Sequence, residues 1–176
     1  MTVLITLQDF VDFRGMTSNI NFDKELKQHV IDAQDFELRM FMGESFYLAL
    51  ETDFNQVPSL PTYSDLFNGV KYVYNSDNYE QPGIKRLLVQ YAYSRYVAAG
   101  GSTSTAFGMV QKNHQHSTPT DSKLIGQISA KARSGATNYE DRIKTYLNRK
   151  SDDYPLWKCT NKKRTVAGGF KITAIG

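Results

Sequence analysis

Apolar residues recur at spacings of three and four in several stretches of the chain, which predicts a mainly helical protein. The first stretch follows Asn21, a residue that can cap a helix, and ends at Gly43. A second helix is predicted over residues 44–54, before Pro58 and Pro61 break the pattern. The stripe of the first stretch, which we expect to face the core, consists of Phe22, Leu26, Val30, Ala33, Phe36 and Met40.

The middle of the chain predicts a short hairpin and then a covered helix. After one further turn or short helix at 63–67, residues 70–74 alternate and lead into turn residues at 75–78, as in a strand or hairpin. Pro82 suits the first position of a helix. Residues 83–99 are apolar on more than half of the helix circumference. We therefore expect this helix to be central and covered by its neighbours.

A polar stretch rich in Ser and Thr follows the covered helix and encloses a small apolar island. A strand that is apolar on both faces must be buried by something outside it. The sequence therefore predicts an arm at about residues 101–120 that has no cover of its own. The island consists of Ala106, Phe107, Met109 and Val110.

A long helix is predicted over about residues 121–150, and the chain ends in a basic tail. The stripe of the long helix is Leu124, Ile128, Ala132, Ala136, Tyr139, Ile143 and Leu147. In the tail, Phe170 and Ile172 alternate with polar positions after two glycines, as in a strand that adds to a sheet edge, with a frayed terminus as the alternative. The predicted domains are a helical domain, 1–157, and a basic, Gly-containing C-terminal arm, 158–176.

Length and composition are those of a single folded domain with arms. The chain has 176 residues, of which 40% are hydrophobic, enough for one core. Its single cysteine, Cys159, cannot form an internal disulfide, which favours a reducing compartment. No apolar run approaches the roughly 18 residues of a membrane span, and the start does not resemble a secretion signal. We expect a protein that is made in the cytoplasm and has no contact with membrane.

Charge is segregated along the sequence. Residues 1–80 contain 13 acidic and 5 basic residues, a net charge of −8, whereas residues 81–176 contain 5 acidic and 16 basic residues, a net charge of +11. Opposite potentials on two surfaces steer identical copies into head-to-tail contact. A monomer whose basic side binds nucleic acid is the alternative explanation.

Motifs of enzymes are absent from the sequence. It contains no phosphate-binding loop, no dinucleotide-binding fingerprint, no nucleophile elbow and no cysteine pair at zinc spacing. His114 and His116 stand without a nearby carboxylate or cysteine, so surface histidines explain them better than a metal site does. Asp32 and Asp35 could serve a metal-dependent nuclease, but the spacing of Asp35 to Arg39 suits a helical ion pair. We expect no catalytic residue, cofactor or metal.

Basic residues along the predicted long helix could lie against DNA phosphates. No sequence-reading module accompanies them, so the contact would be directed at the backbone and sensitive to salt. The candidates for contact with DNA in a channel are Lys123, Lys131, Arg133 and Arg142.

The order of features from about residue 20 to 157 resembles the head-to-tail connector proteins of tailed bacteriophages, also called adaptor or neck ring proteins. The resemblance is closest to the ring proteins of crAss-like phages. It is carried by the helix break at 42–44, the covered helix at 87–96, the arm at 105–110, the long helix, and the closing segment 154–157.

This resemblance implies a structural virion protein without enzymatic activity. It also implies that the arm at about residues 101–120 is an extended β-hairpin whose residues Ala106, Phe107, Met109 and Val110 reach a neighbouring subunit. Typically about twelve copies form a ring under the portal of the head and extend the DNA channel toward the tail. The expected partners are the protein itself, the portal protein, the next tail or neck ring protein, and packaged DNA without sequence specificity. The expected location is the head–tail neck of the virion.

The resemblance also suggests that the region after Trp157 engages the portal or the next ring, although this chain has a longer basic end than the family pattern. The residues expected to bind a partner are Trp157, Lys162, Lys163, Arg164, Phe170 and Ile172. Two other hypotheses stay open: a single-copy DNA-binding protein and a metal-dependent nuclease.

Overall fold

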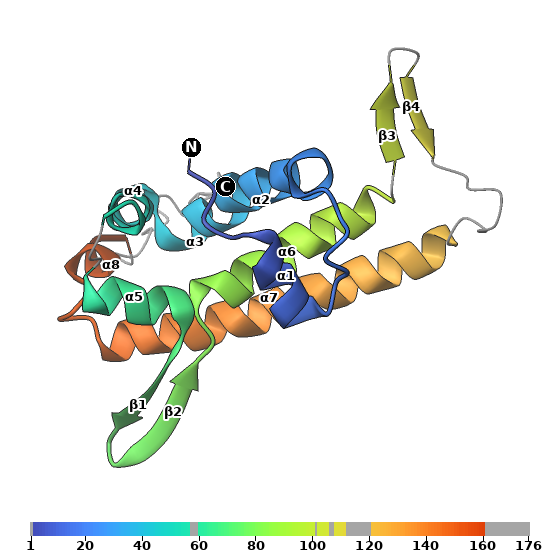
Figure 1. The fold of residues 1–176 in the computed structure, drawn as a ribbon. Helices are drawn as coiled ribbons and strands as arrows, with labels where there is room; N and C mark the ends of the chain where they lie inside the picture. Colours follow the sequence, from blue (N-terminus) through green and yellow to red (C-terminus); the bar gives the residue numbers. More distant parts are fainter. Residues whose placement is uncertain (1, 57–59, 101, 106–107, 112–120, 161–176) are drawn as a thin grey trace, which may run out of the picture.

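The computed structural model describes residues 2–56, 60–100, 102–105, 108–111 and 121–160 (Figure 1). The fold is mainly α-helical with antiparallel hairpins, as predicted. Its helices are α1 (Leu7–Arg14), η1 (Phe22–Leu26), α2 (Lys27–Asp32), η2 (Ala33–Leu38), α3 (Arg39–Met42), α4 (Glu44–Phe54), α5 (Pro61–Asn68), α6 (Ile84–Ala98), α7 (Ser122–Arg149) and α8 (Pro155–Thr160). Its strands are β1 (Val70–Tyr74), β2 (Asp77–Gln81), β3 (Ser102–Thr105) and β4 (Gly108–Gln111).

Helix α6 is the centre of the molecule. Helix α7 packs along one side of α6, and the stretch from α2 to α3 crosses on the other side, with α1 and α5 also against α6 (Figure 1). Eight of the fifteen residues of α6 are buried, among them Leu87, Leu88 and Val89. The prediction of a central, covered helix is therefore confirmed.

In the described part of the chain, two antiparallel hairpins leave the bundle at opposite ends of α6. The β1–β2 hairpin precedes α6 and the β3–β4 hairpin follows it, so the length of α6, about 22 Å for its 15 residues, separates them. In Figure 1 the two hairpins point in opposite directions away from the helices. The bundle therefore carries one arm at each end.

The first long helical stretch contains two π-helical turns, η1 and η2. From η1 to α3 the fully buried residues recur every four positions, wider than the 3.6-residue period of an α-helix, at Leu26, Val30, Gln34, Leu38 and Met42. Phe36 and Met40, predicted to face the core, are consequently 54% and 82% exposed. That prediction was wrong because a π turn contains more residues than an α-helical turn. The positions that face the core therefore shift away from those that a constant α-helical period predicts.

Helix α1 was not predicted, although its boundaries are present in the sequence. The backbone N–H of Thr6 donates to the Asp9 carboxylate at 2.7 Å at the N-terminus of the helix. Gly15 ends the helix at φ 63°, the left-handed conformation that favours glycine. Helix α1 packs against α6 and buries Phe10 completely.

The other helix predictions agree with the structure within a few residues. Helix α4 spans Glu44–Phe54, α7 starts after the cap Asp121, and Asn21 accepts a hydrogen bond from Lys24 N at 3.1 Å. Two details differ. Leu124 is 47% exposed, and Gly83 rather than Pro82 stands at the start of α6. None of the described helices combines the length and apolar character that crossing a membrane requires.

Candidate assembly surfaces

The β1–β2 arm has a tight turn and a fixed base. The two residues of its turn, Asn75 and Ser76, have φ angles of 49° and 68°, the pattern of a type I′ hairpin. At the base, Gly69 and Gly83 both have positive φ, and a Cβ on Gly83 would lie 2.6 Å from the carbonyl carbon of Asn68. Because the two chain segments cross backbone to backbone here, the arm leaves the bundle in a defined direction.

Arg149, in the last turn of α7, holds the inner face of this arm. Its Cζ atom lies 3.8 Å from the ring centroid of Tyr79 and 4.6 Å from that of Tyr74, and Nη1 donates to Tyr72 Oη at 3.1 Å. The rings of Tyr72 and Tyr79 stack across the two strands at 5.6 Å. A guanidinium between aromatic faces gives cation–π attraction as well as packing, so the arm is fastened to α7.

A second group of tyrosines fastens the end of α7 to α5 and α8. The Tyr154 hydroxyl donates to the Thr62 carbonyl at 2.7 Å and lies 3.2 Å from the Tyr146 hydroxyl. Burial raises the pKa of both tyrosines, so the two hydroxyls remain neutral in the physiological range. Tyr146 also packs edge-on against Tyr72, at 4.9 Å, which connects this group to the arm.

The predicted arm at about 101–120 contains the β3–β4 hairpin. Ser102 pairs with Gln111 and Thr105 pairs with Gly108. Of the island residues, Met109 and Val110 are in β4, whereas Ala106 and Phe107 lie outside the described residues, as do 112–120. Neither strand contains a charged residue.

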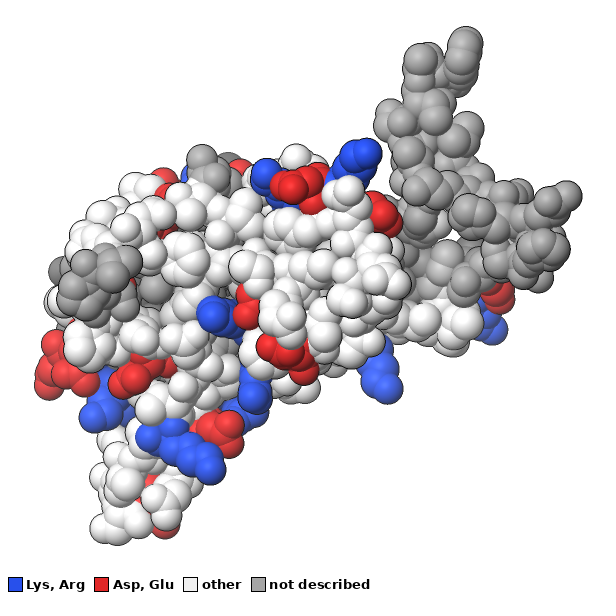
Figure 2. Space-filling model, viewed as in Figure 1, with Lys and Arg blue, Asp and Glu red and all other residues white. Residues whose placement is uncertain are grey.

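Helical layers of opposite charge lie on the two sides of α6. Residues 22–54 contain eight acidic and three basic residues, a net charge of −5, and α7 contains six basic and two acidic residues, a net charge of +4. In Figure 2, positive and negative side chains are interspersed among the described residues on the face in view. The opposite net charges of the two halves of the sequence therefore appear as a difference in net charge between two layers of the fold. They do not form one uniform patch on the face in view.

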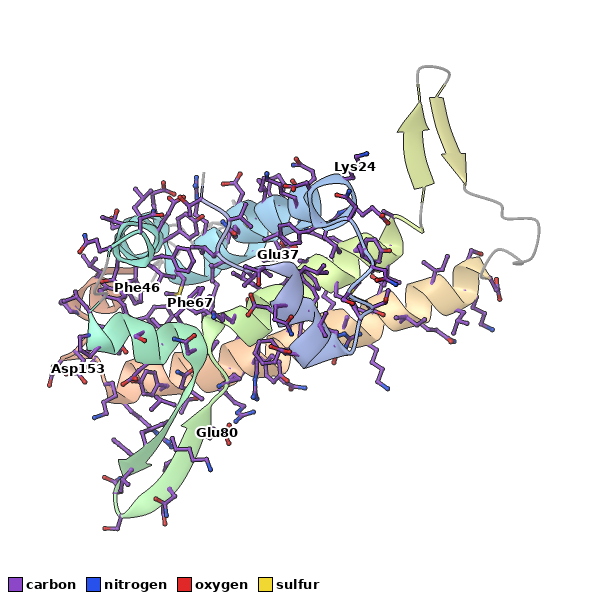
Figure 3. All side chains as sticks on the ribbon, viewed as in Figure 1. Lys24, Glu37, Phe46, Phe67, Glu80 and Asp153 are labelled. Carbon is purple, nitrogen blue, oxygen red and sulfur yellow. The ribbon has the colours of Figure 1, made fainter. Side chains whose placement is uncertain are left out.

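Part of the charge of the two halves is paired within one chain. Glu37, 9% exposed in its side chain, lies between the layers (Figure 3) and binds Arg95 at 2.8 Å and Arg133 at 3.3 Å. Lys85 lies 3.8 Å from Asp9. The net charges of the two halves therefore overstate the unpaired charge that is available to a partner molecule.

The four residues predicted to contact DNA are all exposed on α7, but they differ in their contacts. Arg133 reaches Glu37, and Arg142 donates to the Glu80 carbonyl of β2 at 2.9 Å. Lys123 and Lys131 are exposed. At 100° per residue, Arg133 and Arg142 lie about 180° apart around the helix, so the four do not form one continuous stripe.

Trp157, predicted as part of the partner-binding tail, is a core residue. It is 3% exposed, its indole N–H donates to Asn148 Oδ1 at 2.8 Å, and its ring packs near Phe41 and Phe46. The prediction fails for Trp157 because this ring closes α8 onto α4. The other predicted tail residues, Lys162, Lys163, Arg164, Phe170 and Ile172, lie outside the described residues.

The two acidic residues considered for a nuclease, Asp32 and Asp35, both have partners on their own helical stretch. Asp32 accepts from Gln28 at 2.8 Å, and Asp35 pairs with Arg39 at 3.1 Å. Asp32 lines a surface hollow of about 400 Å³ together with His29, whose pKa is lowered mainly by burial. In the part of the chain that the structure describes, no three acidic, histidine or cysteine side chains gather as metal ligands. His114 and His116 lie outside that part.

Sequence reasoning did not find the aromatic anchor of the β1–β2 arm. Arg149 is about seventy residues away in sequence from the tyrosines of the arm. One signal was present. Three tyrosines at 72, 74 and 79 on a predicted hairpin require a cover, and a cation is a favourable one.

Comparison with protein families gives one match. Residues 38–166, from η2 into the segment beyond α8, match a family of unknown function, DUF6712. No curated protein and no solved structure matches the chain.

Proposed function

Because the chain belongs to the family of unknown function DUF6712, its role has to be inferred from its own residues, and we propose that it is a structural virion protein. In this proposal identical copies form a ring that joins the portal of a phage head to the tail and extends the DNA channel. The partners are further copies, the portal protein and the next neck or tail protein. The role requires no catalytic group and no cofactor.

The observation that carries the proposal is the pair of arms at opposite ends of α6 (Figure 1). A molecule with different projections at its two ends suits a heterologous contact, in which one end of a copy meets the other end of the next. Such contacts close into a ring when the rotation between copies allows it. The resemblance of the order of sequence features to phage connector proteins also implies a ring.

Charge and apolar exposure support the same arrangement. The acidic layer, residues 22–54, and the basic helix α7 lie on different sides of α6, so adjacent copies can meet with complementary potentials. Phe36 and Met40 add exposed apolar area to the acidic layer. Exposed apolar groups surrounded by charge are typical of protein–protein contacts.

Passage of DNA would use exposed lysines of α7 rather than a sequence-reading element. Lys123 and Lys131 are exposed on α7 and can meet phosphates without base contacts. Arg133 and Arg142 already have partners within the chain. Weak, salt-sensitive attraction of this kind suits a channel through which DNA moves.

The test is size-exclusion chromatography with light scattering, on the protein alone and mixed with the portal protein of the same phage, at low and high salt. A stoichiometric, ring-sized complex with the portal is the expected result. Failure to bind the portal, together with tight binding of free duplex by a monomer, would establish the DNA-binding alternative. Cleavage of DNA with Mg²⁺ or Mn²⁺, lost in Asp32→Asn, would establish the nuclease.

A further inference from the structure

The two long edges of the β1–β2 hairpin expose different backbone groups. Across its two-residue turn, Tyr74 pairs with Asp77, and in such a hairpin this pair exchanges ladder hydrogen bonds. Pairs alternate along an antiparallel ladder. The Val73–Asn78 and Lys71–Glu80 pairs therefore direct their N–H and C=O groups outward, Val73 and Lys71 on the β1 edge and the other two on the β2 edge.

Within the described residues, only the β2 edge accepts a hydrogen bond from another element of the chain. Arg142 of α7 donates to the outward-facing Glu80 carbonyl at 2.9 Å, and Glu80 is visible on the arm in Figure 3. In the part of the chain that the structure describes, no hydrogen bond reaches the outward-facing backbone groups of Lys71 and Val73. The Val73 side chain is 63% exposed. β1 is thus an open strand edge of the kind that accepts another strand.

This open edge is held rigidly in place. The stacking of Arg149 on Tyr74 and Tyr79 and the close crossing of Gly69 and Gly83 fix the hairpin on α7. A strand that is already ordered loses little conformational entropy when a second strand pairs with it.

The same chain contains a hairpin that requires a partner. An isolated two-stranded hairpin is marginally stable in water, and three or more strands are normally needed. The β3–β4 hairpin stands at the other end of α6 and points away from β1 (Figure 1), so it cannot pair with β1 of its own chain. Neither of its strands carries a charge that would repel Lys71, and β4 supplies the apolar residues Met109 and Val110.

We propose that β4 of one copy pairs with the open edge of β1 in the next copy, which forms a four-stranded sheet between subunits. The inference rests on the proposed function in one respect, that the partner is a second copy of this chain. It adds the location of the contact. β4, which follows α6 in one copy, pairs with β1, which precedes α6 in the next copy. The contact is made mainly by backbone hydrogen bonds, with Val73 buried beside them.

A pair of proline substitutions tests this contact. Val73→Pro removes an outward-facing N–H from the β1 edge, and Asn78→Pro, at the directly paired position, removes one from the β2 edge. Neither substitution removes a ladder bond, and proline is tolerated where the N–H faces away from the sheet. Val73→Thr keeps the N–H and changes only the side chain.

The readout is the self-association constant of the full chain, from light scattering and sedimentation over a range of concentrations. We expect Val73→Pro to weaken association at least about tenfold, as the loss of hydrogen bonds at an interface does, and Asn78→Pro and Val73→Thr to change it by less than about threefold. Circular dichroism and thermal melting check that each variant folds. If Val73→Pro fails to fold, Met109→Pro on the β4 edge, with Ser104→Pro on β3 as its control, makes the same test from the other partner.

Three results would overturn the inference. Unchanged association of folded Val73→Pro would exclude the β1 edge. Equal losses in Val73→Thr and Val73→Pro would indicate a side-chain contact rather than strand pairing. A wild-type chain that stays monomeric at millimolar concentration would exclude this contact between copies, while the ring proposal would still be decided by mixing with the portal protein.

Discussion

At the residue scale, one buried amide holds the N-terminal segment on the bundle. Gln34 Oε1 accepts from Leu4 N at 2.8 Å, and its Nε2 donates to the Thr2 carbonyl at 2.8 Å. Gln34 is completely buried, in the same π turn that exposes Phe36. The Gln34 side chain therefore provides one hydrogen-bond donor and one acceptor to the backbone of the N-terminal segment. In a sheet, a neighbouring strand would provide them.

Replacing this amide should destabilise the protein clearly. Gln34→Leu keeps the approximate volume but leaves the Leu4 N–H unpaired, and a buried unpaired polar group costs about 1–3 kcal/mol. We expect a loss of about 2 kcal/mol in the free energy of unfolding, measured by urea denaturation. The control is Gln28→Leu, whose side chain is exposed on α2. Equal losses in the two variants would contradict the role of Gln34.

Glu140 of α7 predicts a dependence of stability on pH. Burial raises the pKa of this carboxyl, and the charges of Asp141 and Glu37 raise it further, against the hydrogen bond of Tyr91 and the charge of Lys144. A raised pKa in the folded state means that protonated Glu140 stabilises the fold. This contribution is complete below the pKa of the unfolded chain and is lost as pH rises through the pKa of the folded one.

Glu140→Gln should therefore be more stable than the wild type at neutral pH, with the difference in melting temperature shrinking to zero as pH falls below the unfolded-state pKa of about 4.3. The amide oxygen can still accept from Tyr91. Melting curves from pH 3.5 to 8 measure the difference, and Asp141→Asn, which removes only a neighbouring charge, should give a smaller gain. A variant that is less stable than the wild type at pH 7 would show that the ionised carboxylate is needed.

At the element scale, the β1–β2 arm depends on Arg149 for its position. Arg149→Lys keeps the charge but loses the planar guanidinium that lies on Tyr74 and Tyr79. We expect lower stability and faster hydrogen exchange at the backbone amides of residues 70–81. Lys144→Ala, an exposed cation on the same helix, is the control. Unchanged exchange in the arm of Arg149→Lys would mean that the glycine crossing alone positions it.

The elements also differ in how far the sequence could predict them. Helices α4 and α7 follow a regular period between clear stop signals, so their positions were predicted within a few residues. The π turn η2 could not be predicted, because its one extra residue is stabilised by contacts such as those of Gln34 with Leu4, which are distant in sequence. Arg149 was missed for the same reason, since its tyrosine partners come from another part of the chain.

At the scale of the whole molecule, the segregation of charge along the sequence overestimates the charge that a partner would meet on the surface. Helix α6 brings residues of the two halves together, and Glu37 is paired with Arg95 and Arg133 inside one chain. A charge count cannot tell such internal pairs from groups offered to a partner. What remains is the difference between the layers, −5 over residues 22–54 and +4 over α7, and this difference can be tested by changing the sign of one exposed position.

Met40 is the position for this test because it is 82% exposed in the acidic layer. Met40→Lys and Met40→Glu remove the same side chain and add charges of opposite sign, and both should change unfolding stability by less than about 0.5 kcal/mol, as surface substitutions usually do. If the acidic layer meets the basic helix α7 of a neighbouring copy, Met40→Lys should assemble with the portal protein less well than Met40→Glu at low salt. The difference should disappear at about 1 M salt, where screening acts within about 3 Å. Equal assembly of the two variants at low salt, measured by light scattering, would show that this layer does not face a basic surface in the ring.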